Sequence, residues 1–509
     1  MNRPIRFMVA ANSWVVAGLA FWFLFGPVLM LWADLRDPGL RDGQVPRRAF
    51  RWQRDLAGPY ERWARRRVAS GRAAALKVGD VSGTEWPMFG SVFFLWATEA
   101  LQDAWEADPG LAAQAPAVAS RGAIEAAADL IADPGHAGWV KTHWGDEYLS
   151  RENLFYRMLL IAGLTSRERL LGWGPHHDLL VEQVESLALE IDRSPFGLLD
   201  DYPGECYPID VLPAVAVIRR ADAVLGTDHS AFVARALRAF EGGRLDRSTG
   251  LPAYEVEARS GVAIGPSRGV GVAYMLIWAP ELWPETARAW YALFAGRYWR
   301  TDPLLSGFRE YARGSGRPEW GFEVDAGPVI AGFGTAASAF GVGASRVNGR
   351  FDHAYPLAVE ALAASWPLPD GTRLVPRFLS NAVDAPYLGE AALLFCLTRT
   401  PAQGVTLIPG RGGMPGLVYL TAAFWIVGGS VTLTATFQAW RRWRRGGESW
   451  IVPLGRFQFA AWSALMIAAL ATLATSRPGV ALLFALAGQL LPRGARWTAP
   501  PGPSSPDGS

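Results

Sequence analysis

The chain is poor in the residues that build cross-linked or metal-centred folds. It has two cysteines and six histidines among 509 residues. Cys206 and Cys396 lie far apart in the sequence, and the histidines show no ligand spacing apart from His176-His177, a pair expected in a surface loop. The sequence therefore supports neither a disulfide framework nor a Cys/His metal cluster. We assign no metal ligands and expect no cofactor.

An excess of charge is also missing. The formal net charge is +2, so neither a basic surface for nucleic acid nor an acidic tail is indicated. The chain is instead rich in apolar and aromatic side chains, with half of its residues hydrophobic and 23 tryptophans. This composition suits a large helical enzyme with an aromatic-lined cavity, and it also suits a membrane protein.

Long apolar runs indicate membrane-spanning helices near both ends of the chain. Val9 to Ala33 is uncharged and long enough to cross a bilayer, and no small-residue cleavage site ends it, so we expect a retained anchor. A second run, Gly416 to Ala439, stops at Arg441-Arg442-Trp443-Arg444-Arg445. Phe457 to Thr475 and the shorter Val480 to Leu491 add one or two further segments.

These runs divide the chain into four parts. We predict an N-terminal anchor over residues 1–40, a central domain over 41–410, two to three membrane segments over 411–492, and a disordered tail rich in Pro, Gly and Ser over 493–509.

The arginines that flank the spans predict the orientation. Placing 441–445 in the cytoplasm puts the central domain outside, and Arg3 and Arg6 agree. The arginines after the first span favour the opposite orientation, but large domains translocate with little regard for charge. We expect an integral protein of a bacterial inner membrane with its central domain in the periplasm. The opposing arginines are Arg36, Arg41, Arg47 and Arg48.

The central domain has a helical pattern throughout. Apolar residues recur at helical spacing in twelve segments, while only Gly250 to Val256 and Thr372 to Pro376 resemble short hairpin pieces. The predicted helices are Arg51 to Val68, Met88 to Trp105, Ala113 to Ile131, Asn153 to Leu164, Leu179 to Ile191, Ile209 to Ala223, Ser230 to Phe240, Val270 to Trp278, Glu285 to Tyr298, Gly327 to Phe340, Tyr355 to Trp366 and Pro386 to Leu397.

Loops of similar composition precede every second helix. Each combines Gly or Pro with acidic or aromatic residues, and they recur at a period of about 60 residues, which is the signature of an array of helical hairpins. Six hairpins that close on themselves make an all-α (α/α)6 toroid or barrel, with the helix N-termini converging at one mouth. The loops are Gly83 to Pro87, Trp144 to Tyr148, Tyr202 to Cys206, Ile264 to Arg268, Glu319 to Asp325 and Val383 to Tyr387.

Asn153, Tyr156 and Arg157 share one face if a helix begins near Ser150. We predict that these three residues bind substrate inside the toroid. The alternative is an exposed capping box at Ser150. Because Met158 to Ile161 makes this helix apolar nearly all round, a buried Arg157 needs an acidic partner.

Leu198 to Asp210 is a turn crowded with acids. A carboxyl group in an apolar interior has a raised pKa and can protonate a leaving oxygen, while a thiol at a helix N-terminus has a lowered pKa and can act as a base. We therefore predict that Asp201, Glu205 and Cys206 are catalytic and that Tyr202 binds substrate. The alternatives are an elaborate helix entry and a cysteine that is simply buried.

Asp325 is the fourth predicted catalytic residue, as a carboxylate that faces Glu205. The alternative is that Asp325 or its neighbour Glu323 caps a helix that Pro328 begins. The remaining predicted substrate-binding residues are Arg268, Trp320 and Glu323.

Several features together resemble the linalool dehydratase/isomerase family. They are the paired helices, the turn Tyr202 to Cys206, the segment Glu152 to Arg157 and Asp325 to Pro328. The resemblance covers the central domain and none of the membrane segments. It implies an (α/α)6 barrel that adds water to a small alkenol, or removes it, by acid–base catalysis without a cofactor. That family's site uses cysteines with acidic, tyrosine and histidine side chains. Of this chain's residues, only Cys206 can be matched to that site.

The sequence thus predicts a membrane-anchored hydro-lyase or isomerase, whose partners are a small-molecule substrate and the lipid bilayer and not nucleic acid. One alternative is a carbohydrate-active (α/α)6 glycosidase or lyase, with Trp86, Trp144 and Trp320 as sugar platforms beside two carboxylates. The other is a membrane-bound binding or assembly protein without catalytic activity.

Overall fold

The computed structural model describes residues 3–76, 80–323, 325–365, 373, 376, 379–411 and 413–444, and short pieces between 461 and 488. The protein is mostly helical, at 65%, as the sequence pattern predicts. Its residues form two compact units. One comprises Met1–Trp32, Pro367–Asp370 and Leu420–Ser509; the other, which we call the central unit, comprises Ala33–Trp366 and Gly371–Tyr419.

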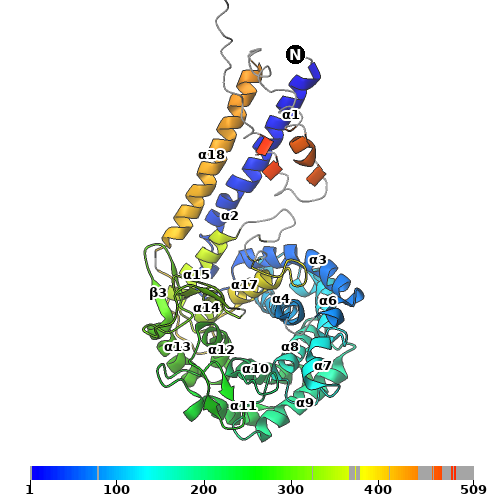
Figure 1. Ribbon diagram of the computed structural model, residues 1–509, viewed down its shortest axis with the longest axis vertical. Coiled ribbons are helices and arrows are strands. Elements are labelled where there is room, and N and C mark those ends of the chain that lie inside the picture. The colour runs from blue at the N-terminus through cyan, green and yellow to red at the C-terminus, as the bar shows by residue number, and fades with distance from the viewer. Residues whose placement is uncertain are drawn as a thin grey trace, which may run out of the picture. The chain divides into compact units, whose positions relative to one another are not determined.

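Six helices of the central unit contact one another in a closed series. Each packs against the next one along the chain, and the last packs back against the first. Figure 1 shows these helices following one another in that order. We call them the inner helices. They are α4 (Val81–Ala107), α8 (Leu154–Leu171), α10 (Pro208–Leu225), α12 (Gly269–Leu282), α14 (Thr335–Val347) and α17 (Leu388–Thr398).

The helices that alternate with this series along the chain cover it. Each packs against at least one inner helix and lies further from the middle of the central unit in Figure 1. This alternation follows the helix pairing expected from the sequence. The covering helices are α3 (Arg47–Ala69), α6 (Arg121–Ala132), α9 (His177–Arg193), α11 (Ser230–Ala236), α13 (Pro284–Tyr298) and α15 (Phe351–Ala364).

The first predicted loop is wrong, because Gly83 to Pro87 lies inside α4. Asp80 caps this helix by accepting a hydrogen bond of 3.1 Å from the backbone N–H of Gly83. Pro87 has no N–H to offer the carbonyl of Gly83, and Arg67 of α3 donates to that carbonyl at 2.6 Å instead. The helix passes through the proline because another element satisfies the freed backbone group.

The predicted helix Gly327 to Phe340 is wrong in its first half. Gly327–Ile330 is strand β6 and Phe333–Gly334 is strand β7, and the helix begins only at Thr335. β-branched Val329 and Ile330 favour extended backbone, and the turn that follows has positive φ at Ala331 and Gly332, which ends any helix there. Pro328 therefore begins no helix.

Short antiparallel strands account for the remaining irregular segments. β5 (Gly321–Glu323) pairs with β6, and β6 pairs with β7. β3 (Trp299–Thr301) and β4 (Ser306–Phe308) form a hairpin, and β1 (Val256–Glu257) pairs with β2 (Val262–Ala263). Of the two predicted hairpin pieces, the first contributes only Val256 to a strand, and the second lies largely outside the described residues.

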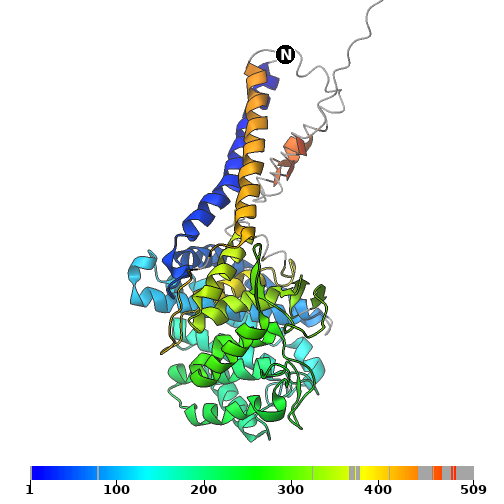
Figure 2. The ribbon, with the colours of Figure 1, turned by 90° about the vertical axis from the view of Figure 1, so that its left-hand side faces the viewer.

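Two stretches of helix are long and apolar enough to cross a membrane. Ser13–Asp34 lies near the N-terminus and runs through α1 (Arg3–Ala20), the π-helical turn η1 (Phe21–Phe25) and α2 (Gly26–Asp34). Gly416–Thr434 belongs to α18 (Gly416–Arg444), the long helix seen side-on in Figure 2. Only short pieces of the two further predicted membrane segments are among the described residues, and the predicted tail lies wholly outside them: Phe457 to Thr475, Val480 to Leu491 and 493–509.

Candidate functional site

One face of α4 carries an acid near each end and aromatic rings between them. Glu85, Phe89, Phe93, Trp96 and Glu99 recur at intervals of three or four residues, so they share this face. The rings meet aromatic side chains from four other inner helices at centroid separations of 4.5 to 5.8 Å. These partners are Phe155, Tyr274, Trp278, Phe340 and Phe395. The acids at the two ends therefore belong to two separate polar sites.

Glu85 is a half-buried carboxyl group near the start of α4. Burial raises its pKa to about 7; a hydrogen bond from the hydroxyl of Tyr202 offsets part of this shift, and the charges of Asp325 and Glu205 add to it. A carboxyl group with a pKa near 7 is present in both protonation states at neutral pH, as a group that gives and takes protons must be.

Asp201 and Asp210 lie at the start of α10. The Asp201 carboxylate accepts hydrogen bonds from the backbone N–H of Phe155 at 2.8 Å and of Tyr207 at 3.2 Å, which joins the first turns of α8 and α10. Burial raises the pKa of both aspartates well above the usual range, and the charge of Asp210 adds to the effect on Asp201. The two N–H groups favour the charged form of Asp201, so they offset part of the rise in its pKa.

Tyr254 connects the carboxylates to the loop before α12. Its hydroxyl donates a hydrogen bond of 2.7 Å to Asp325, and the guanidinium carbon of Arg268 lies 4.3 Å from the centre of its ring. Arg268 also pairs with Glu310 at 2.8 Å and with Glu323 on β5. Burial raises the pKa of Glu310 to about 7, although Arg268 offsets part of that shift. Arg268 thus ties this loop to β5.

Four carboxyl groups and two phenols form what we call the acidic cluster. They come from α4, from the loop before α10, from α10 itself, from the loop before β1 and from the segment after β5, and electrostatic interactions connect the carboxyl groups. The cluster consists of Glu85, Asp201, Asp210, Asp325, Tyr202 and Tyr254.

Three of the predicted residues belong to this cluster and two others lie at its edge. Asp201, Tyr202 and Asp325 are members. Glu205 is exposed and accepts a hydrogen bond of 3.0 Å from the hydroxyl of Tyr207, and its charge still reaches Glu85. Arg268 touches the cluster through Tyr254. The turn singled out in the sequence is therefore one wall of the candidate site.

Cys206 is fully buried, at 0% exposure, beside Val256, with which it forms a β-bridge. The expectation of a lowered pKa is wrong. Burial raises the pKa of this thiol, and the negative charge of Asp201 raises it further. The thiol precedes the first turn of α10, but loss of solvation outweighs the helix dipole there. The raised pKa favours the neutral thiol at neutral pH.

Asn153, Tyr156 and Arg157 contact the loop before α8 and the covering helix α9. The amide of Asn153 donates to the carbonyl of Tyr148 at 2.9 Å, and the ring of Tyr156 packs 5.7 Å from the ring of Tyr148. Arg157 is fully buried and pairs with Glu190 of α9 at 2.5 Å, which confirms the predicted acidic partner. The helix begins at Leu154, later than the expected start near Ser150. The Arg157–Glu190 pair holds α8 against its covering helix.

The two remaining predicted substrate-binding residues, Trp320 and Glu323, lie on or beside β5. Trp320 is 69% exposed, and Glu323 accepts a hydrogen bond from the hydroxyl of Tyr311 in addition to its pair with Arg268. Among the described residues, neither is joined to the four carboxyl groups by a hydrogen bond or an ion pair.

The sequence did not identify Glu85 or Tyr254 as site residues, and it did not commit to Asp210 or Glu310. Asp210 stood in the acidic turn and was the easiest to find. Glu85 lay in a segment predicted as a loop, although the helical spacing of Glu85, Phe89 and Phe93 marks a common face. Tyr254 meets Asp325 from 71 residues away, and no local pattern signals such a contact.

The far end of the same α4 face has a different chemistry. Glu99 is 2% exposed and accepts hydrogen bonds from Arg169 at 2.7 Å, Arg220 at 2.9 Å and Ser166 at 2.7 Å. These partners come from the C-terminal parts of α8 and α10. The carboxylate is fully compensated, so this end of the inner helices is an ionic structural network.

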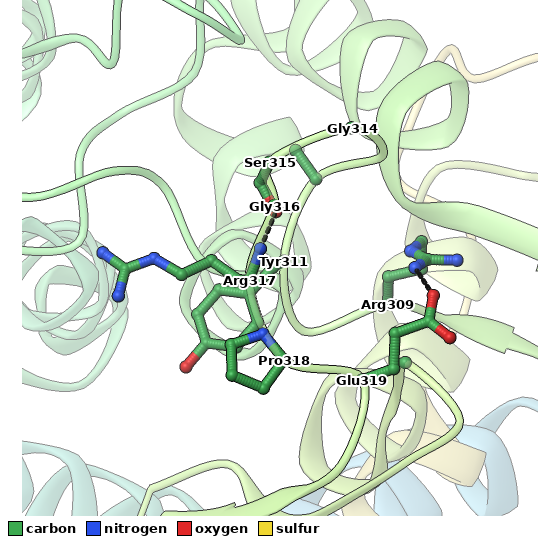
Figure 3. Close-up of a pocket in the computed structure, with 10 residues that line it drawn as sticks. Arg309, Tyr311, Gly314, Ser315, Gly316, Arg317, Pro318 and Glu319 are labelled. Atoms are coloured by element: carbon green, nitrogen blue, oxygen red, sulfur yellow. Dashed lines mark hydrogen bonds and ion pairs between the residues drawn. The ribbon is translucent and has the colours of Figure 1, made fainter.

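A pocket of about 210 Å³ lies in the segment between β4 and β5 and is drawn in Figure 3. Arg309 and Glu319 are joined on one side of it at 2.6 Å, and Arg317 extends from the other side of the loop. Glu323, which binds Tyr311 of this lining, connects the pocket to Arg268. The pocket is adjacent to the candidate site and distinct from the acidic cluster.

Within the part of the chain that the structure describes, no group of three or more His, Cys, Asp or Glu side chains is arranged to hold a metal ion. Comparison with known proteins identified no relative, since neither a protein-family model nor a curated protein sequence matches this chain. The family resemblance drawn from the sequence motifs thus stays a prediction.

Proposed function

We propose that this protein is a membrane-anchored acid–base enzyme that removes water from a small, largely apolar alkenol, or adds it, without a cofactor, as the linalool dehydratase/isomerase family does. The proposal includes an (α/α)6 toroid whose inner helices surround the substrate. The closed series of inner-helix contacts and the alternation with covering helices support this architecture.

The arrangement of the acidic cluster beside aromatic rings carries the proposal. Glu85 has a pKa of about 7, and the partly exposed rings of Phe89, Phe155 and Phe340 lie among the inner helices next to it. An apolar chain would pack on these rings while its hydroxyl reached the carboxyl groups. A carboxylic acid that is partly protonated at neutral pH, beside an apolar surface, suits the dehydration of an apolar alcohol.

In the proposed reaction, protonated Glu85 donates its proton to the substrate hydroxyl as the C–O bond breaks and water leaves. A carboxylate of the cluster, which we assign to Asp325, takes a proton from the adjacent carbon, and the C–H electron pair forms the new double bond. The proton then returns from Asp325 to Glu85, so the cluster ends as it began. Tyr202 and Tyr254 hold these two carboxyl groups by hydrogen bonds.

The test compares two glutamates of α4 in the full-length chain, purified in detergent. E85Q removes the proposed acid, and E106Q makes the same change at an exposed site on the same helix. Product formation from a tertiary alkenol is measured by gas chromatography. We expect E85Q to lower kcat by about 10²-fold or more and E106Q to leave it unchanged. Full activity of E85Q would contradict the assignment.

A second candidate, glycoside hydrolysis, is favoured by Trp320 and Phe322, which are 69% and 70% exposed close to Asp325 in the sequence. Sugar rings stack on such surfaces, and two carboxyl groups of the cluster would then act as acid and base. Offering the wild-type chain aryl glycosides beside the alkenol separates the two reactions. Binding of either compound without turnover would instead favour a non-catalytic role.

We further propose that Ser13–Asp34 and Gly416–Thr434 span a bacterial inner membrane and that the central unit lies on its periplasmic side. The length and apolar composition of the two helices support the spans. The arginines from Arg441 onward support the orientation, because such runs are retained in the cytoplasm.

A further inference from the structure

One face of the β5–β6 pair is apolar and exposed. Phe322 stands opposite Pro328 in the antiparallel register, so Trp320 and Ile330 are the next pair on the same face. Trp320 is 69% exposed, Phe322 70% and Ile330 47%, while Val329 on the other face is buried. Exposed aromatic and aliphatic side chains gathered on one strand pair are a common sign of a binding surface.

The pocket of Figure 3 continues directly from this face. Its lining residues Pro318 and Glu319 run into β5, and Gly332, which follows β6, donates its backbone N–H to the carbonyl of Glu319 at 2.7 Å. Arg309 pairs with Glu319, but its Nε atom is buried without a hydrogen-bond partner, and Arg317 is exposed. Guanidinium groups in a small pocket suit a phosphate oxygen.

Contacts within the central unit connect this region to the first residues of α18. The backbone N–H groups of Gly416 and Leu417 donate to the carbonyls of Pro303 at 3.0 Å and Leu304 at 2.9 Å, at the tip of the β3–β4 hairpin. Arg300 on β3 donates to the carbonyl of Ala331, in the turn after β6, at 2.8 Å. The start of an apolar helix is therefore bonded to the hairpin that holds the exposed strand pair.

We propose that the exposed face of β5–β6 lies in the interface of the lipid bilayer and that the adjacent pocket binds the phosphate of an anionic phospholipid. Tryptophan and phenylalanine favour the headgroup level of a bilayer, and arginines beside them are attracted to anionic lipids. The inference rests on the proposed function in one respect, namely that α18 is a membrane span.

The native cysteines make a site-specific test practical, because Cys206 and Cys396 are both 0% exposed and will not react with a thiol probe in the folded chain. F322C, W173C and V427C are each labelled with an environment-sensitive fluorophore in the full-length chain. They report on the proposed interface, on an exposed tryptophan site elsewhere in the central unit and on the apolar helix α18. The chain is placed in nanodiscs that contain nitroxide-labelled lipid.

We expect nitroxide lipid to quench the probes at positions 322 and 427 by about two-fold or more and to leave the probe at position 173 unquenched. Quenching at 427 without quenching at 322 overturns the interface while preserving the membrane span. No quenching at 427 overturns the span and the interface together. A blue-shifted but unquenched probe at 322 indicates contact with a second copy of the chain and also overturns the interface.

The headgroup site is tested by adding phosphatidylglycerol to phosphatidylcholine nanodiscs. R317Q changes the exposed arginine of the pocket, and R288Q is the matched control on α13, where the side chain is 71% exposed. We expect anionic lipid to increase quenching at position 322 by about two-fold in F322C and in F322C/R288Q, and not in F322C/R317Q. An equal increase in F322C/R317Q overturns the headgroup site.

Discussion

Two glutamates on one face of α4 have opposite electrostatics. Burial raises the pKa of Glu85 to about 7 among other carboxyl groups. Burial also favours the neutral form of Glu99, but the charges of Arg220 and Arg169 and a hydrogen bond from Ser166 outweigh it and lower the pKa. The more deeply buried glutamate is therefore the more acidic one, so partners and not depth decide which end of the helix is suited to proton transfer.

The guanidinium of Arg268, which lies beside the acidic cluster, does not restore this balance. Arg268 is already engaged by Glu310 and Glu323, and the ring and hydroxyl of Tyr254 connect it to Asp325. The cluster therefore holds protons where the network around Glu99 holds ion pairs. Each prediction below alters one side of this contrast.

The largest effect is expected at the ionic end. E99Q removes the carboxylate that pairs with Arg220 and leaves Arg169 only its pair with Asp103. Breaking a buried ion pair from one side costs about 3 kcal/mol or more in the free energy of unfolding. Chemical denaturation followed by circular dichroism measures the loss. The exposed E106Q should change stability by less than about 0.5 kcal/mol. Equal stability of E99Q and E106Q would show that the network around Glu99 does not contribute to the free energy of unfolding.

A smaller effect of opposite sign on the free energy of unfolding is expected from E85Q at the acidic end, where the change should raise stability above pH 7. The folded state keeps the proton of Glu85 up to a pH of about 7, while a free glutamate loses it near 4.5. Glu85 therefore stabilises the fold below pH 4.5, and this contribution is lost as the pH rises through about 7. The free energy of unfolding of the wild type should thus fall between pH 4.5 and about 7. E85Q should make this fall smaller by about 1–2 kcal/mol, after allowance for the partial exposure of Glu85. Parallel pH–stability curves for wild type and E85Q would rule this out.

The smallest effect is expected at the buried thiol between the cluster and β1. C206A removes one buried sulfur atom and should lower the free energy of unfolding by about 1 kcal/mol. Because the raised pKa of Cys206 favours the neutral thiol, the variant should keep the wild-type pH–rate profile for alkenol turnover. A loss of activity greater than about tenfold would show that Cys206 takes part in the reaction.

Helical periodicity predicted most of the inner and covering helices, because each buries an apolar face that repeats locally. Prediction from periodicity failed where residues distant in the sequence determine the backbone conformation. Arg67 lets α4 continue through Pro87, and sheet pairing with β5 turns the segment from Gly327 into a strand. The acidic turn was found from its composition, whereas Glu85 entered the site only when α4 was seen to include it.

The side chains of Asn153, Tyr156 and Arg157 illustrate the same limit. Their spacing predicted a common face, but spacing does not say which neighbour that face meets. Arg157 turns to Glu190 on α9, so the acid it required lies on a covering helix. A buried arginine thus signalled helix packing, and the sequence alone could not separate this role from substrate binding.

The closed series of inner helices also sets the order in which the chain can fold during synthesis. α4 packs against α17, which the ribosome adds roughly 300 residues later. At 5–20 residues per second, this part of the α4 surface stays without its partner for on the order of 15–60 s. Until then Phe93 and Trp96, whose ring partner Phe395 belongs to α17, lack that contact. For that interval this part of the α4 face lacks its cover, and apolar surface that stays exposed in this way is prone to aggregate.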